Sequence, residues 1–156
     1  MVTLFKFIHL LSIVVWIGSV VFFSFFAAPS IFKVLPRETA GDVVGDIFPK
    51  YWIINYFCSL VALFTLLGLS LMEGVFPFLR VAVLAALTLL VFYSGIFIGS
   101  EARDVKARMK AVEDRAEREK MREEFKRLHR KSSTMNMVVL TVGLIFIWLT
   151  AAGISL

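Results

Sequence analysis

Long stretches without charged residues dominate the pattern of this chain. Four runs of 26, 22, 20 and 25 residues lack Asp, Glu, Lys and Arg: Phe7–Phe32, Tyr51–Met72, Val81–Ser100 and Ser132–Leu156. A helix rises about 1.5 Å per residue, so about 20 apolar residues cross the roughly 30 Å hydrocarbon core of a bilayer. We therefore predict an all-α fold, a four-helix transmembrane up-down bundle. It forms one domain over residues 1–156, with spans at about 4–32, 50–72, 78–100 and 130–155.

The charged segment 101–131 between the third and fourth runs predicts helix as well. It contains no Gly or Pro and is rich in strong helix formers. Asp114 and Glu117 fit a helix N-terminus in its middle, because an Asp N-cap with Glu three residues later is a capping-box pattern. On either side lies an apolar triplet spaced i, i+4, i+7: Val105, Met109 and Val112, then Met121, Phe125 and Leu128. We expect these stripes to face each other in a cytoplasmic helical hairpin. A single amphipathic helix on the membrane surface is the alternative.

The connection between the first and second runs contains two prolines. Pro36 and Pro49 each suit the first turn of a helix, which predicts a short interfacial helix between them. Gly41 and Gly45, four residues apart, would let that helix pack closely against a neighbour. The segment is either a structural connector or a gate for a solute, and its motif residues are Pro36, Arg37, Thr39, Gly41, Phe48 and Pro49.

The distribution of Lys and Arg predicts the orientation in the membrane. Twelve lie between the third and fourth runs and three between the first and second, whereas the other side has only Lys6 and Arg80. The positive-inside rule therefore places both large connections in the cytoplasm and both termini outside, in a cell membrane and most simply a bacterial inner membrane. The net charge of +5 reflects this topology. It does not predict nucleic-acid binding, because acidic residues alternate with the basic ones.

Polar residues inside the runs are candidates for function, because they are costly in a membrane and usually face the bundle interior. The first run places four of them on one helical face, with offsets of three, seven and ten from the first. Together with one Asn in each of two other runs they predict a polar seam: His9, Ser12, Trp16, Ser19, Asn55 and Asn136. The alternative is that these small and polar residues only tighten helix packing.

A second group of candidates lies where three runs meet the cytoplasm. We expect a hydrogen-bonded cluster of Tyr51, Glu101, Arg103, His129 and Ser133, with His129 bonded to the ends of the second and third spans. Such a cluster is either a functional mouth or an interfacial anchor, since Trp, Tyr and Arg favour that depth.

Catalytic and metal-binding patterns have little support. The sequence has one cysteine, Cys58, and no acidic dyad, nucleophile–base arrangement or Gly-rich phosphate loop. An enzyme is therefore the less favoured reading, and no catalytic residue is assigned. No cofactor is required by the sequence; haem or copper bound through His9 is the alternative.

Several motifs resemble the transmembrane protein 205 family and its bacterial relatives. They are Phe7-Ile-His9-Leu-Leu11, Leu35-Pro36-Arg37-x-Thr39-x-Gly41-x-Val43, Phe48-Pro49-x-Tyr51, Ala102-Arg103 and Phe125-x-Arg127-x-His129-x-x-Ser132-Ser133-x-x-Asn136. The resemblance implies four spans and an association with tolerance of a platinum drug. It supplies no catalytic residues, and the segment between spans three and four is shorter here than in the family. A shorter stretch, His9 to Gly18, is similar to four-helix copper-resistance and protoporphyrinogen-oxidising membrane proteins.

Three functional hypotheses remain open from the sequence. The leading one is a non-enzymatic integral membrane protein, embedded in the lipid bilayer and homo-oligomeric, that takes part in transport or tolerance of a small solute or metal species. The second is a haem-, copper- or quinone-associated redox protein using His9. The third is a scaffold whose 101–131 hairpin docks a soluble partner.

Overall fold

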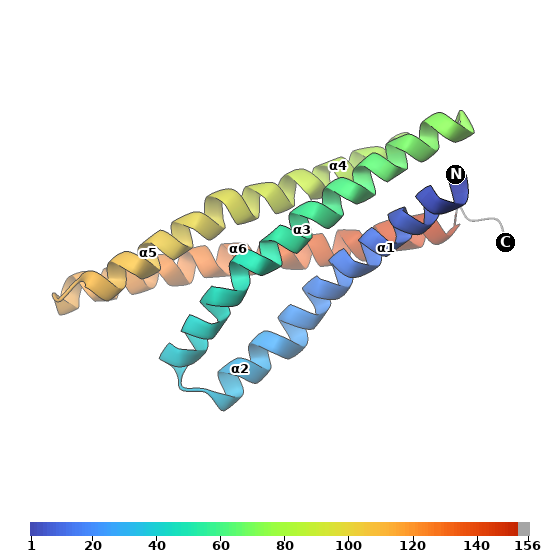
Figure 1. Ribbon diagram of the computed structural model, residues 1–156. Helices are drawn as coiled ribbons and strands as arrows, with labels where there is room; N and C mark the ends of the chain where they lie inside the picture. The colour runs from blue at the N-terminus through green and yellow to red at the C-terminus, as the bar shows by residue number, and fades with distance from the viewer. Residues whose placement is uncertain (153–156) are drawn as a thin grey trace.

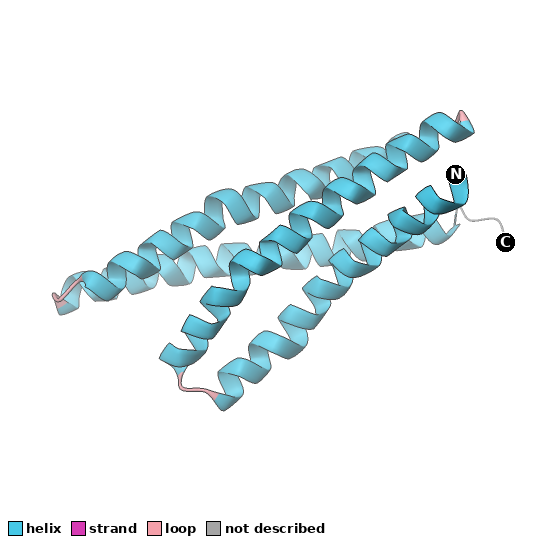
Figure 2. Ribbon diagram, in the orientation of Figure 1, coloured by secondary structure: helices cyan, strands magenta, loops and turns pink. Residues whose placement is uncertain are grey.

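The protein is entirely helical over the part that the structure describes. The computed structural model describes residues 1–152 and contains four long helical rods joined by short turns (Figure 1). Each rod is long and apolar enough to cross a membrane, which confirms the predicted fold class. Residues 153–155 of the fourth predicted span lie outside the described residues. Figure 2 shows that loop conformation is confined to the turns between the rods.

The first rod runs from Val2 to Val34 and changes its helical geometry on the way. It consists of α1 (Val2–Val21), a π-helical segment η1 (Phe22–Ala27) and α2 (Ala28–Val34). The rod ends at Leu35, which has an extended backbone (φ −105°, ψ 150°) because it precedes Pro36. The second rod is the single helix α3 (Arg37–Glu73), which ends at Gly74 with a left-handed φ of 66°.

The third rod likewise contains a π-helical segment. It consists of α4 (Phe78–Tyr93), η2 (Ser94–Ile98) and α5 (Gly99–Ala111), and the fourth rod is α6 (Arg115–Ala152). The turns at 35–36 and 112–114 lie at the same end of the bundle but apart from each other; this end is called here the hairpin end. The N-terminus and the 74–77 turn lie at the other, the N-terminal end (Figure 1). The up-down order predicted from the sequence is therefore confirmed.

One predicted element is wrong. The short interfacial helix between Pro36 and Pro49 is not separate, because α3 continues through Pro49 without a break. Pro49 lacks an N–H, so the Gly45 carbonyl has no helical donor there, and Pro49 itself lies on the exposed side of the helix. The preceding turns are held from outside the helix: Lys106 Nζ donates a hydrogen bond to the Gly41 carbonyl at 2.7 Å and pairs with Asp42 at 2.9 Å.

The predicted hairpin between the third and fourth rods is confirmed. The α5 helix continues the third rod to Ala111, and α6 begins at Arg115. Asp114 caps α6, since its carboxylate accepts hydrogen bonds from the backbone N–H groups of Ala116 and Glu117, each at 3.3 Å. The stripes meet only in part. Val105 and Leu128 are buried against Met121 and Phe125, together with Ile98, Ala102 and Met135, while Met109 and Val112 lie outside this cluster.

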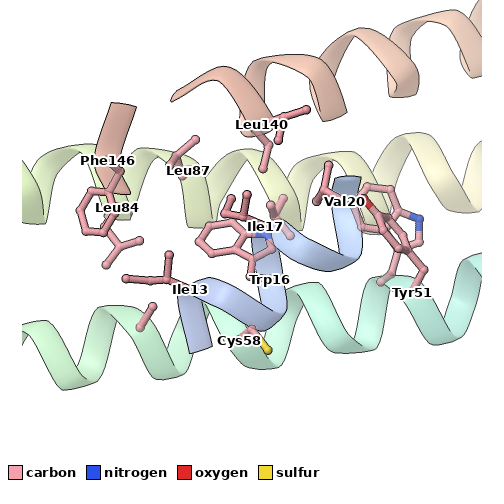
Figure 3. Packing of buried hydrophobic residues seen from close by; sticks show 14 of the residues in the cluster. Ile13, Trp16, Ile17, Val20, Tyr51, Cys58, Leu84, Leu87, Leu140 and Phe146 are labelled. Carbon is pink, nitrogen blue, oxygen red and sulfur yellow. The ribbon is translucent and has the colours of Figure 1, made fainter. Parts of the chain in front are cut away.

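The main core lies between the four rods and is centred on Trp16. This indole is 1% exposed and lies among side chains from α1, α3, α4 and α6, as the close view in Figure 3 shows. Close approach of α1 to α6 depends on Gly143, because a Cβ there would collide with the Ile17 side chain. Large apolar side chains on the outer faces are exposed instead, among them Phe57, Phe64 and Leu89, as expected of a lipid-facing surface.

Candidate functional site

A hollow of about 390 Å³ opens at the hairpin end, between the first rod, the start of α3 and the face of α6. The rods α1–α2 and α6 lie close together near Gly143 and diverge toward the hairpin end, as Figure 1 shows. The hollow is lined by Phe23, Ser24, Phe25, Ala28, Pro29, Phe32, Val44, Phe48, His129, Ser133, Asn136 and Met137. It lies where the charges of α6 stop, since Arg130 and Lys131 follow His129 and the uncharged run begins at Ser132.

One face of α6 supplies most of the polar groups of the hollow. His129, Ser133 and Asn136 are spaced i, i+4, i+7, so they share one helical stripe. Asn136 is 8% exposed, yet its amide has no hydrogen-bond partner among the described residues. Its amide atoms are not enclosed by protein but border the open space, so this side chain is available for a hydrogen bond to a molecule in the hollow.

The opposite wall is aromatic and comes partly from the π-helix. The η1 segment contributes Phe23, Ser24 and Phe25, and π-helical turns occur frequently at functional sites. Phe23 packs edge-on against Phe48 of α3, with ring centroids 5.2 Å apart and an interplanar angle of 73°. Tyr51 lies behind this pair, 5.1 Å from Phe23 and 6.0 Å from Phe48 between ring centroids. The wall is therefore a packed aromatic layer that is continuous with the bundle core.

The electrostatics of the hollow are those of a neutral site. None of its lining residues is Asp, Glu, Lys or Arg. His129 is its titratable side chain; it stacks on Phe125, with centroids 6.2 Å apart and an interplanar angle of 15°. Desolvation by the surrounding protein lowers the pKa of His129 below its ordinary value. In its neutral form the imidazole offers one N–H donor and one acceptor nitrogen.

The residues of the predicted cytoplasmic cluster separate in the structure. His129 and Ser133 line the hollow, and Tyr51 lies behind its aromatic wall. Glu101 and Arg103 are exposed on α5 and do not line it. Among the described residues His129 makes no hydrogen bond to the ends of the second and third spans; its ring stacks on Phe125 of its own helix.

The predicted polar seam is also divided. His9 is buried and joins α1 to α3, with Nδ1 at 3.0 Å from both the Ala62 carbonyl and Thr65 Oγ1. Ser12 and Ser19 donate hydrogen bonds to carbonyls of their own helix, as does the Asn55 amide to Tyr51. These contacts are those of the packing alternative. Asn136 belongs to the hollow instead.

Four buried side-chain atoms in the described part of the chain have no hydrogen-bond partner. They are His9 Nε2, Trp16 Nε1, Tyr51 Oη and Ser94 Oγ. The His9 ring meets Phe146 edge-on, with centroids 6.2 Å apart. No group of three or more His, Cys, Asp or Glu side chains comes together among residues 1–152 in a way that could hold a metal ion.

The loop motif is divided between two roles. Phe48 lines the hollow, and Gly41 lies beside the Lys106 ammonium, which bonds its carbonyl. Pro36 is the N-cap residue of α3, while Arg37, Thr39 and Pro49 are exposed. Asp42, which sequence reasoning did not single out, pairs with both Lys106 and Lys110 at 2.9 Å. Those hydrogen bonds, that of Lys110 foremost, hold the pKa of Asp42 below its ordinary value.

Ser24 and Met137 are further lining residues that sequence reasoning missed. The sequence could have indicated Ser24, because it is the one polar residue in the aromatic run Phe22–Phe26. No sequence pattern predicted the π-helical geometry of this run.

These features define the class of the protein: a helical multi-pass membrane protein with a neutral, partly polar hollow at one end of its bundle. The chain belongs to the family described as a domain of unknown function, DUF4149, which matches residues 11–111. That range includes the aromatic wall of the hollow and ends before the α6 face. No relationship to the transmembrane protein 205 family in particular emerges from the comparisons.

A relative is found in Aquifex aeolicus (strain VF5), where it is described as an uncharacterized protein. It is 46% identical over 55 residues, which make up 35% of this chain and 40% of the relative. The chain thus matches less than half the length of this relative. No solved structure matches the chain.

Proposed function

We propose that this protein binds a small, partly apolar solute in the hollow between η1, α2, α3 and α6, and that this binding serves transport or tolerance of the solute. The observation that carries the proposal is Asn136, whose amide borders the hollow beside Ser133 and His129 and makes no hydrogen bond within the described part of the chain. Ligand sites are typically apolar clefts with a few well-placed polar groups, which describes this hollow.

Growth in the presence of toxic solutes tests this function. Cells that lack the protein are complemented with the wild type, with Asn136→Leu or with Thr134→Val, at equal amounts in the membrane. Thr134 is exposed on the same helix and does not line the hollow, so its variant is the matched control. We expect the wild type and Thr134→Val to restore tolerance to the same compounds, and Asn136→Leu to fail. Equal protection by Asn136→Leu would contradict the proposal.

We further propose that the hairpin end faces the cytoplasm of a bacterial inner membrane, which the fifteen-to-two distribution of Lys and Arg supports. The test uses single cysteines at 115 and at 75 in a Cys58→Ala background, because these positions lie at opposite ends of the bundle. A membrane-impermeant thiol reagent should label position 75 in intact cells and spare position 115. Faster labelling at 115 would reverse the orientation and move the hollow to the outer side.

A further inference from the structure

We propose that the hollow takes an uncharged ring with oxygen atoms on opposite sides, such as a quinone or its hydroquinone. This inference rests on the proposed function of the hollow as a solute site, and it names the class of solute. Three independent features of the lining support it: the absence of counter-ions among the lining residues, the spacing of the polar groups on α6, and the aromatic wall opposite them.

The lining disfavours a charged ligand. A charge moved out of water is costly unless it is paired, and no Asp, Glu, Lys or Arg side chain is among the residues that line the hollow. The polar groups present are hydroxyls, an amide and an imidazole whose pKa is lowered by desolvation. Each of them can donate a hydrogen bond to a neutral oxygen, and each can accept one from a hydroxyl. These groups therefore suit carbonyl and phenol oxygens.

The spacing along α6 sets the length of the ligand. His129 and Asn136 are seven residues apart, which corresponds to about 10.5 Å along the helix axis. A six-membered ring with oxygens at opposite positions, hydrogen-bonded at each end at about 2.8 Å, has a comparable length. Ser133 lies between them on the same stripe, beside the body of such a ring.

The walls suit a flat ring. Phe23, Phe25, Phe32 and Phe48 face the α6 stripe, and aromatic side chains pair with other rings in offset-stacked or edge-to-face arrangements. The volume of about 390 Å³ lies within the usual range of about 300–1,000 Å³ for small-molecule sites. Phe25 and Phe32 line the hollow and are also exposed, so an apolar tail on the ring would continue along a lipid-facing surface.

The test is equilibrium binding to the full-length protein in lipid nanodiscs, with empty nanodiscs as background. Three probes share a six-membered ring: duroquinone, which is neutral with opposed oxygens, the benzoate anion, and the benzyltrimethylammonium cation. We expect saturable binding of duroquinone alone. Binding should weaken about tenfold in Asn136→Leu, the order expected when hydrogen bonds to a buried oxygen are lost, and should be unchanged in Thr134→Val.

Ser133→Ala is the second variant, because Ser133 is exposed in the hollow and its loss should not disturb folding. It should weaken duroquinone binding by a few fold. The inference is overturned if duroquinone does not bind, or if it binds equally well to the wild type and to both variants. If a charged probe binds in its place and requires Asn136, the class of solute is wrong while the proposed function of the hollow stands. If Asn136→Leu also protects cells fully, both fail.

Discussion

The two ends of the bundle contain similar residues and use them differently. At the N-terminal end the rods pack tightly: Phe146 is 1% exposed, and a Cβ added to Gly68 would lie 2.7 Å from Phe5 Cε1. At the hairpin end the first rod and α6 separate, and Phe32 is 45% exposed on the wall of a hollow. The side chains between the rods are therefore closely packed at the N-terminal end, whereas open space remains at the hairpin end.

The polar groups follow the same division. His9 is engaged with α3 through Nδ1, and nearby Ser12 bonds its own helix. Asn136, which is 8% exposed, has no hydrogen-bond partner among the described residues, and its amide borders open space. A polar group that borders open space can bond a ligand, whereas one enclosed in a packed core, such as His9, is reached only by its protein neighbours. The comparison separates structural polar residues from functional candidates within one membrane bundle.

Truncation of one phenylalanine at each end should give the largest difference in the free energy of unfolding. Phe146→Ala removes a fully buried ring and should lower the free energy of unfolding by about 3–5 kcal/mol. Phe32→Ala removes a half-exposed ring from the edge of the hollow and should cost less than about 1 kcal/mol. Unfolding in mixed micelles, followed by circular dichroism, measures both. Equal losses would mean that the hairpin end is packed as closely as the N-terminal end.

The hairpin itself should behave as a small separate core. Leu128→Ala removes a buried side chain from the cluster around Val105 and should cost about 2–3 kcal/mol. The loss should be local, so backbone amides of α5 exchange faster with deuterium while those of α1 keep their protection. Met109→Ala, outside the cluster, is the control and should leave exchange nearly unchanged. Faster exchange throughout the bundle would contradict a separate hairpin core.

A smaller effect is expected at the contact that ties the start of α3 to α5. Asp42→Asn removes the charge that pairs with Lys106 and Lys110. Spin labels at the exposed positions 39 and 108 should then show a broader distribution of distances. Asp46→Asn is the matched control, because Asp46 pairs with Lys50 on its own helix and joins no second rod. Identical broadening in both variants would mean that the Asp42 contact does not hold the two rods together.

The smallest effect is expected from acid, which weakens the contact of Asp42 with Lys106 and Lys110. The pKa of Asp42 is lowered in the folded protein, so the contact is fully formed above the ordinary Asp range near about 3.9 and is lost as the pH falls through the lowered pKa. The distance distribution between positions 39 and 108 should therefore stay narrow down to about pH 4 and broaden only in stronger acid. Asp42→Asn should be equally broad throughout. Broadening of the wild type between pH 5 and pH 7 would contradict the assignment.

The sequence predicted the parts of this fold that depend on local pattern. Runs without charge indicated the four rods, and Asp114 with Glu117 indicated where the hairpin turns. It failed at Pro49, because a local rule for proline does not include the Lys106 contact that holds the preceding turns in α3. The site was predicted in pieces. His129, Ser133 and Asn136 were all candidates, but Asn136 was assigned to another group, because the divergence of α6 from the first rod is a feature of tertiary packing that no local pattern predicts.

The most direct test of the central claim is native mass spectrometry of the protein released from its own membrane in the mass spectrometer. If the hollow is a solute site, the wild type and Thr134→Val should carry the same small bound molecule, and Asn136→Leu should lose it. The mass of that molecule and its fragments should be those of an uncharged, oxygen-bearing ring. A wild type without any bound molecule, or one retained equally by Asn136→Leu, would contradict the account.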